Sequence, residues 1–167
     1  EQSGLPLTFH IAPKAGDFYG VIDDPGLPRL EKVLQMFPNL KFLGHSQMFW
    51  AEIGTNTIEN GERIPYPKGP VTPGRVVDLM RKYPSLLGDL SAGSGFIAIS
   101  RDPEFGYGFM EEFQDRLFFG TDIANVPQDL PIVDYFKRLK TEKRISNDAY
   151  EKITWKNAGR LLGLGLA

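Results

Sequence analysis

Short apolar runs alternate along the chain with longer amphipathic stretches, and this alternation predicts strands that are each followed by a helix. The runs are rich in β-forming residues and are bounded by proline, glycine or polar residues, which is typical of strands. They span residues 7–11, 41–45, 86–90 and 117–120.

The stretches after the first two runs carry helical periodicity. After the first run, apolar residues recur at spacings of three and four, which places them on one face of a helix that starts near Pro28 and stops at Pro38. After the second run, a long loop over residues 46–72 is predicted, because it is rich in glycine and proline. Thr72 is then expected to cap a helix with Pro73 at its first position.

The last two runs are also followed by predicted helices. These segments are 94–100, 103–113, a helix that opens at Pro131, 147–154 and 157–162. Asn157 is expected to be the N-cap of the last helix, and Gly163 is expected to stop it.

A strand–helix unit repeated four times predicts an α/β fold with a parallel sheet and right-handed crossovers. Four such units fit either an open doubly wound sheet or half of an eight-stranded TIM barrel. Neither a GxGxxG motif nor a P-loop follows the first strand, which disfavours nucleotide-binding folds. Residues 93–95 could cradle an anion at a helix start, although a plain turn is the simpler interpretation. The whole chain, 1–167, is expected to form one domain.

Composition narrows the class of protein. The chain is 41% hydrophobic and 24% charged with a net charge of -2, which is globular and gives no reason to expect nucleic acid or a membrane surface as partner. No apolar run approaches the roughly 18 residues of a membrane helix. The absence of cysteine fits a cytoplasmic protein. The first residues lack both a signal-peptide pattern and methionine, so we expect a cut or processed piece.

Ionisable groups lie at or just beyond the end of every predicted strand, in the order His10, His45, Asp89 and Asp122. Functional groups gather at the carboxyl ends of strands in parallel α/β folds. Both of the chain's two histidines occupy such positions. This placement is the strongest pointer to function in the residues themselves.

Two imidazoles and a carboxylate suit a divalent metal, with zinc favoured and manganese, iron or cobalt as alternatives. A metal with an open position makes water a usable nucleophile near neutral pH, and a nearby histidine or aspartate accepts the proton. Taken singly, His10 and His45 could each be a buried histidine bonded to the backbone. Asp122 could be a turn or capping residue, and Asp89 is expected to support a ligand rather than be one.

A serine nucleophile is a weaker alternative. Ser46 and Ser91 follow strands, but neither lies in the G-x-S-x-G elbow that exposes such a nucleophile. The strand-end serines are therefore not expected to carry the reaction.

Four segments together resemble one family. They are LTFH at 7–10, FLGH at 42–45, RLFFGTD at 116–122 and NAGRLLGL at 157–164. They resemble the amidohydrolase-related family, in the branch often called amidohydrolase 2, whose metal-dependent TIM barrels include hydrolases and decarboxylases. The resemblance covers nearly the whole chain, and its third and fourth segments are the most specific.

The resemblance implies that the four strands are the fifth to eighth strands of a barrel. His10, His45 and Asp122 then match metal ligands, with His45 and Asp122 also catalytic, and Trp50 lies in a loop over the substrate pocket. The family's His-x-His pair on the first strand is absent here. We therefore expect a C-terminal half-barrel that needs a missing N-terminal half or another chain, and that binds metal weakly or not at all alone.

The function implied is hydrolysis of a C–O or C–N bond in a small molecule, with a carboxylic acid as the candidate substrate class. Lys14 and Arg101 are candidates for holding a substrate carboxylate, since arginine in particular suits carboxylates, and Trp50 for contacting the substrate. A metal-dependent decarboxylase, a lyase built on the same residues, is the first alternative. A non-catalytic half-barrel is the second, and this fragment alone is expected to be inactive.

Overall fold

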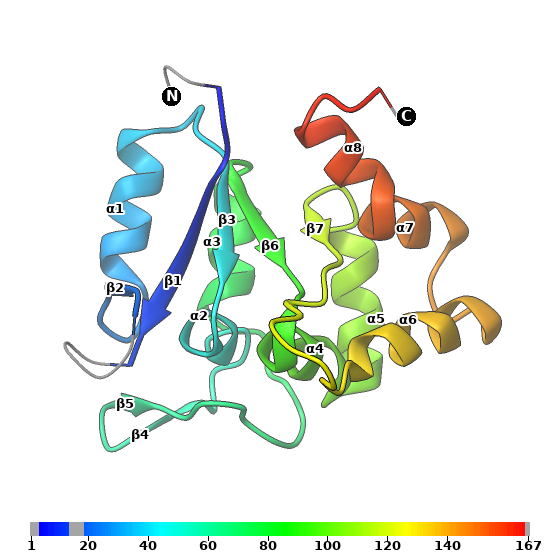
Figure 1. Ribbon diagram of the computed structural model, residues 1–167. Helices are drawn as coiled ribbons and strands as arrows, with labels where there is room; N and C mark the ends of the chain where they lie inside the picture. Colours follow the sequence, from blue (N-terminus) through cyan, green and yellow to red (C-terminus); the bar gives the residue numbers. More distant parts are fainter. Residues whose placement is uncertain (1–3, 14–18, 166–167) are drawn as a thin grey trace.

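The computed structural model describes residues 4–13 and 19–165, and these form an α/β fold around one parallel sheet (Figure 1). The sheet has five strands in the order β2-β1-β3-β6-β7, and every neighbouring pair is parallel. The strands are β1 (Leu7–Ala12), β2 (Val21–Ile22), β3 (Phe42–His45), β6 (Leu86–Asp89) and β7 (Leu117–Phe118). All four predicted strands are present, and the parallel α/β class is confirmed.

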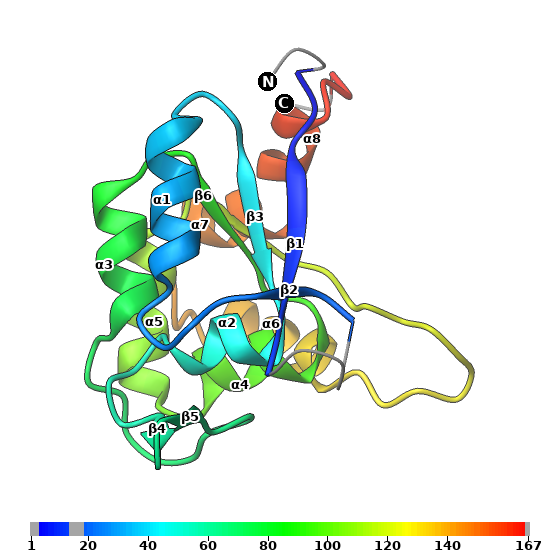
Figure 2. The ribbon, with the colours of Figure 1, turned by 90° about the vertical axis from the view of Figure 1, so that its left-hand side faces the viewer.

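Helices follow each of the four main strands. They are α1 (Pro28–Met36), α2 (Gln47–Ala51), α3 (Arg75–Lys82), α4 (Ala92–Ser100), α5 (Pro103–Glu112), α6 (Pro131–Thr141), α7 (Asn147–Glu151) and α8 (Asn157–Leu161). Figure 2 shows α1 and α3 side by side on one face of the sheet, while the loop after β7 projects from the opposite side. No helix in residues 4–13 and 19–165 is both long enough and apolar enough to cross a membrane.

The stretch 46–72 is more ordered than the sequence predicted. It contains α2 and an antiparallel hairpin of β4 (Ile58–Glu59) and β5 (Glu62–Arg63), so the prediction of an uninterrupted loop was wrong. Periodicity missed both because α2 is a little over one turn long and the hairpin strands have two residues each. The next helix begins at Arg75 with Gly74 as N-cap, two residues later than the Thr72 cap predicted.

Two buried charges fix this hairpin to the body of the fold. Nε of Arg63 lies 2.5 Å from Oε1 of Glu52, which follows α2, and both side chains are 3% exposed. Nη1 of Arg63 also donates to the Asp23 carbonyl at 2.8 Å, and Oε2 of Glu52 accepts from the Gly26 N–H at 2.8 Å. Because both charges are paired and hydrogen-bonded, they can be buried without a free charge in the interior.

The C-terminal helices form one continuous run rather than a separate pair. A π-helical segment, Lys152–Lys156, joins α7 to α8, and Asn157 therefore lies inside a helix. The N-cap prediction for Asn157 was wrong: its side chain is 1% exposed and donates to the carbonyls of Gln114 at 2.7 Å and Leu117 at 2.9 Å. Gly163 does end the helix, with a positive φ of 65°.

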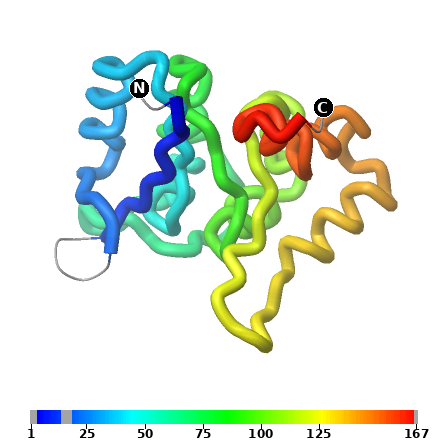
Figure 3. Tube along the Cα trace, turned by 45° about the horizontal axis from the view of Figure 1, so that its top comes forward, coloured from blue at the N-terminus to red at the C-terminus, as the bar shows by residue number. Residues whose placement is uncertain are grey.

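The sheet is open at both edges. β2 pairs with β1 only at Ile11 and Ala12, which leaves the first part of β1 as an edge with Leu7 47% exposed. At the other edge, the side-chain amide of Asn157 donates a hydrogen bond to the Leu117 carbonyl of β7. Figure 3 shows α1 and α8 on opposite sides of the fold. The described strands therefore form an open sheet with one edge bare and the other partly capped.

Asn157→Ala is predicted to lower the free energy of unfolding by about 2 kcal/mol, because it leaves the buried Leu117 carbonyl and the partly buried Gln114 carbonyl without their donor. Urea unfolding followed by circular dichroism measures this. Asn147→Ala is the matched control, since Asn147 is exposed at the start of α7 and should cost less than about 0.5 kcal/mol. Equal, small losses in both variants would contradict this account of the β7 edge.

Candidate active site

The parallel register brings the strand-end residues into one row. His10 of β1 is the direct register partner of His45 of β3. Gly44 pairs with Gly88 of β6, so Asp89 comes next to His45 in the same row. Paired residues of a parallel sheet project to the same face, and the two imidazole centroids lie 5.8 Å apart. The predicted meeting of His10, His45 and Asp89 at one sheet end is thus observed.

Asp89 orients the imidazole of His45. Nδ1 of His45 lies 3.0 Å from Oδ2 of Asp89. The same carboxylate is held by Ser91, whose N–H donates to Oδ1 and whose hydroxyl donates to Oδ2, both at 2.9 Å. A histidine that gives one ring nitrogen to a carboxylate has its other nitrogen fixed in direction. The geometry therefore leaves Nε2 of His45 as the nitrogen for ligand or substrate.

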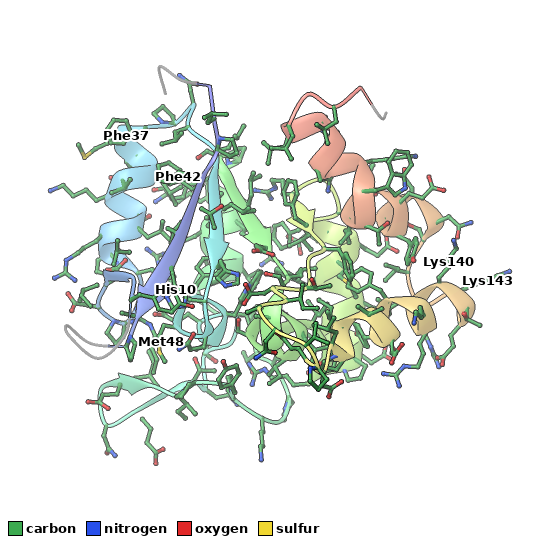
Figure 4. The ribbon with its side chains drawn as sticks, in the orientation of Figure 1. His10, Phe37, Phe42, Met48, Lys140 and Lys143 are labelled. Atoms are coloured by element: carbon green, nitrogen blue, oxygen red, sulfur yellow. The ribbon has the colours of Figure 1, made fainter. Side chains whose placement is uncertain are left out.

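His10 lies at the end of β1 (Figure 4) and has an unsatisfied nitrogen. Its Nδ1 is buried and has no hydrogen-bond partner in the described part of the chain. The Tyr19 ring lies against the imidazole with centroids 4.4 Å apart. Gly20 has a φ of 126°, and a Cβ there would lie 2.9 Å from Nδ1. Glycine is needed at this position for the chain to pass so close to His10.

The pKa values of the two histidines are shifted in opposite directions. Burial and the nearby His45 lower the pKa of His10, against smaller opposite effects of the Tyr19 backbone and Asp122. The hydrogen bond to Asp89 raises the pKa of His45, and burial opposes it. Burial alone would raise the pKa of Asp89, but the hydrogen bonds from His45 and Ser91 outweigh it, so this pKa is lowered. Around neutral pH, His10 is therefore the neutral imidazole and Asp89 is ionised.

Asp122 lies beyond the sheet rather than in the row. The register partner of Asp89 on β7 is Phe118, and Asp122 follows four residues later in an exposed loop with a positive φ of 53°. Its carboxylate raises the pKa of both His10 and His45, so its charge acts on the same site. Gln128 ties this loop by donating to the Asp122 carbonyl at 3.1 Å.

Trp50 supports the site from inside the core. Its side chain is only 2% exposed. The ring is therefore not accessible to a substrate, in contrast to the prediction that Trp50 contacts one. The indole N–H donates to the Asp89 carbonyl at 2.8 Å, and a Cβ at Gly88 would lie 2.8 Å from the ring. Trp50 instead packs α2 onto the sheet. It fixes the end of β6.

Of the two predicted substrate cations, Arg101 does not join the row. Arg101 follows α4, which begins just after β6, so about 15 Å of helix separates it from Ser91. Two of its side-chain nitrogens, Nε and Nη2, are buried without a hydrogen-bond partner among the described residues, and a Cβ at Gly54 would lie 2.7 Å from Nη2. Burial lowers the pKa of Arg101. Lys14 lies outside the described residues.

The serines at the strand ends are structural. Ser91 and Nδ1 of His45 share the same Asp89 oxygen, whereas a catalytic serine needs the opposite ring nitrogen. The Ser46 hydroxyl oxygen accepts from the N–H groups of Ile11 and Phe49, each at 3.1 Å. The role of Ser91 was missed in the sequence, although an aspartate followed two residues later by an N–H donor is a known local turn.

Of the predicted ligands His10, His45 and Asp122, the two histidines have the geometry that best suits a shared divalent metal. A separation of 5.8 Å between ring centroids is within reach of two imidazoles that share one ion at about 2 Å from each nitrogen. The unsatisfied Nδ1 and the carboxylate-oriented His45 are both features of histidine ligands. However, no group of three or more potential ligands is arranged around one point in residues 4–13 and 19–165. The described residues therefore contain no complete metal site, and the two histidines are the candidates among them for holding an ion.

Comparison with known proteins gives one match. A family model described as amidohydrolase matches residues 1–164, which is nearly the whole chain. No match is found among curated proteins or among solved structures.

The two histidines should titrate apart. We predict that His45 has a pKa above the ordinary 6.5 and His10 a pKa below it, and that Asp89→Asn lowers the value of His45 because the carboxylate acceptor is lost. The raised pKa means that this pair stabilises the fold fully below pH 6.5 and loses that stabilisation as pH rises through the folded-state value. NMR of the ring protons measures both values, since the chain has only two histidines.

Asp148→Asn is the matched control for this titration, because Asp148 is exposed and pairs with Lys152. It should leave both histidine curves in place. An Asp89→Asn protein whose His45 curve does not move would show that the carboxylate does not set the state of that ring.

Proposed function

The chain belongs to the amidohydrolase family, and on this premise we propose that it contributes a metal-assisted hydrolase site in which His10, His45 and Asp122 are the ligands and proton carriers. Family membership indicates a function of the hydrolase or decarboxylase type, and members usually bind divalent metals. The proposal adds the residues and the bond type, a C–O or C–N bond. Zinc is the favoured metal, with manganese, iron or cobalt as alternatives.

One observation carries the proposal: the register pair His10 and His45, backed by the Asp89 carboxylate. A chance pair of surface histidines would not share a row at the carboxyl end of a parallel sheet, where active sites of α/β proteins lie. Nor would a surface histidine have an ionised carboxylate held in place by a second residue, as Ser91 holds Asp89. The carboxylate favours a His45 ring of fixed orientation, which is what a ligand requires.

The residues divide the work according to their environments. His10 is the neutral imidazole and His45 presents Nε2, so both offer lone pairs to a divalent metal. When bound, such a metal supplies Lewis acidity that makes water a usable nucleophile near neutral pH. Asp122 is exposed and its charge acts on both histidines, so its carboxylate would take the proton from the attacking water. Proton return to the leaving group completes hydrolysis.

The proposal includes a larger barrel around this site. The chain would supply strands five to eight, and an N-terminal half or another chain would supply the remaining strands and ligands. Two observations support this: β1 is bare along its first residues, and the described residues provide no three-ligand cluster. A third observation is an apolar cleft of about 260 Å³ between β1, β2 and α1, which leaves apolar side chains of β1 beside an open space. Metal binding by this chain alone is therefore expected to be weak.

The substrate in this proposal is a small molecule, with a carboxylic acid as the favoured class. Lys14 and Arg101 stay as predicted carboxylate partners, but Arg101 lies a helix length from the histidines, so only an extended substrate would reach both. A decarboxylase that uses the same residues would release carbon dioxide. A non-catalytic half-barrel would keep its metal content and activity unchanged in the His10→Ala and Asp122→Ala variants.

Isothermal titration with Zn²⁺ tests the ligand set. His45→Ala is predicted to abolish binding and Asp89→Asn to weaken it about tenfold, because the imidazole loses its orienting carboxylate. Asp122→Ala should weaken binding, whereas Asp129→Ala, which removes an exposed carboxylate from the same loop, should not. If His10→Ala and Asp122→Ala bind Zn²⁺ as the parent does, the histidine row is structural.

Activity is tested on this chain and on any longer or partnered form that carries it. Esters, lactones and amides are screened with Zn²⁺ and Mn²⁺, and carbon dioxide release is followed from aromatic and unsaturated acids. The longer form should hydrolyse at least one class, with a loss of about 100-fold or more in its His45→Ala variant. Carbon dioxide release without hydrolysis would make the site a decarboxylase, and silence in both assays by a form that holds metal would overturn the proposed activity.

A further inference from the structure

A recess away from the histidine row lies between three helices. It has a volume of about 400 Å³, within the range of small-molecule pockets. Its walls come from the C-terminal half of α4, the start of α5 and the second half of α6. In Figure 1 these three helices meet below and beside β7. Neither the row of His10, His45 and Asp89 nor the loop of Asp122 contributes to it.

Aromatic side chains form its apolar part. Phe96 of α4 and Tyr135 of α6 meet edge to face with centroids 5.7 Å apart, and Tyr107 of α5 completes the wall. Burial raises the pKa of Tyr135, whose hydroxyl donates to the Ile99 carbonyl at 2.9 Å. This tyrosine is therefore neutral and already bonded, and it offers only its ring. Such a wall suits a flat apolar group.

Two arginines and one glutamate line the recess. The side chain of Arg138 makes no hydrogen bond or ion pair with any described residue. Arg144 also lines the recess and is paired with Glu142, Nε to Oε2, at 3.0 Å. Figure 4 labels Lys140 and Lys143 at the same end of α6. Arg138 is therefore the arginine of the recess whose side chain has no carboxylate partner among the described residues.

We propose that this recess binds a small aromatic carboxylate, with its ring against Phe96, Tyr107 and Tyr135 and its carboxylate on the guanidinium of Arg138. A planar guanidinium matches a carboxylate with two parallel hydrogen bonds, which a lysine does not. Aromatic walls select a ring over an aliphatic chain of equal charge. The free guanidinium and the ring wall therefore specify the two ends of one ligand.

The site is independent of the proposed hydrolase function. It uses none of the proposed metal ligands and its binding needs no metal. Failure of the carboxylate site would therefore not bear on the hydrolase proposal, and failure of the hydrolase proposal would not bear on the carboxylate site. It is a second place on the chain where a carboxylic acid can be held, separated from the histidine row by the body of α4.

Benzoate is the probe, titrated into ¹⁵N-labelled protein without added metal and followed by amide chemical shifts. We expect saturable shifts in α4, α5 and α6 with a Kd on the order of 1 mM, as for a very small ligand. Arg138→Gln should weaken binding about tenfold, and Tyr107→Ala should weaken it similarly. Lys143→Gln is the matched control, since it removes one nearby positive charge outside the recess and should leave the Kd unchanged.

Two further probes separate the parts of the ligand. Acetate lacks the ring and benzyl alcohol lacks the charge, so each should bind at least about tenfold more weakly than benzoate. Thermal unfolding of the variants confirms that they are folded. Absence of saturable shifts with benzoate overturns the proposal, and so do shifts confined to the histidine row or a Kd that rises equally with Arg138→Gln and Lys143→Gln.

Discussion

The parallel pairing of β1 with β3 is the constraint on which the site depends. This register sets His10 directly beside His45, and a slip of one residue would turn one imidazole to the opposite face of the sheet. The next pair, Gly44 with Gly88, carries the row on to Asp89. One register therefore decides both the distance between the histidines and the hydrogen bond that orients one of them.

The register is itself fixed by close packing at the strand ends. Gly44 and Gly88 have no side chains because the rings of Phe49 and Trp50, from α2, occupy that space. Trp50 also bonds the Asp89 carbonyl, and Ser46 bonds the N–H of Ile11. The short helix α2 and its N-cap Ser46 thus contact β1, β3 and β6. Because the core is closely packed, a cavity made in α2 would shift the strand ends that carry the histidines.

The sequence predicted the parts of this arrangement that repeat and missed the parts that depend on packing. Strand and helix order followed from apolar periodicity, and the meeting of His10 with His45 followed from the parallel class. Periodicity could not show α2 or the β4–β5 hairpin, because each is too short to have a period. Asn157 was assigned from local pattern and Trp50 from the family resemblance, whereas tertiary burial decided the roles of both. Closure into a barrel stays a proposal, since the sheet of this chain is open.

Titration with Co²⁺, followed through the ring protons of His10 and His45, tests whether these two residues form one metal site. Both histidine signals should shift together along one curve with a common midpoint, because the two rings would share one ion. Displacement of both by Zn²⁺ should follow the same curve. If one signal responds without the other, or neither responds while the protein is folded, the histidine row is not a metal site and the proposed hydrolase centre has to be abandoned.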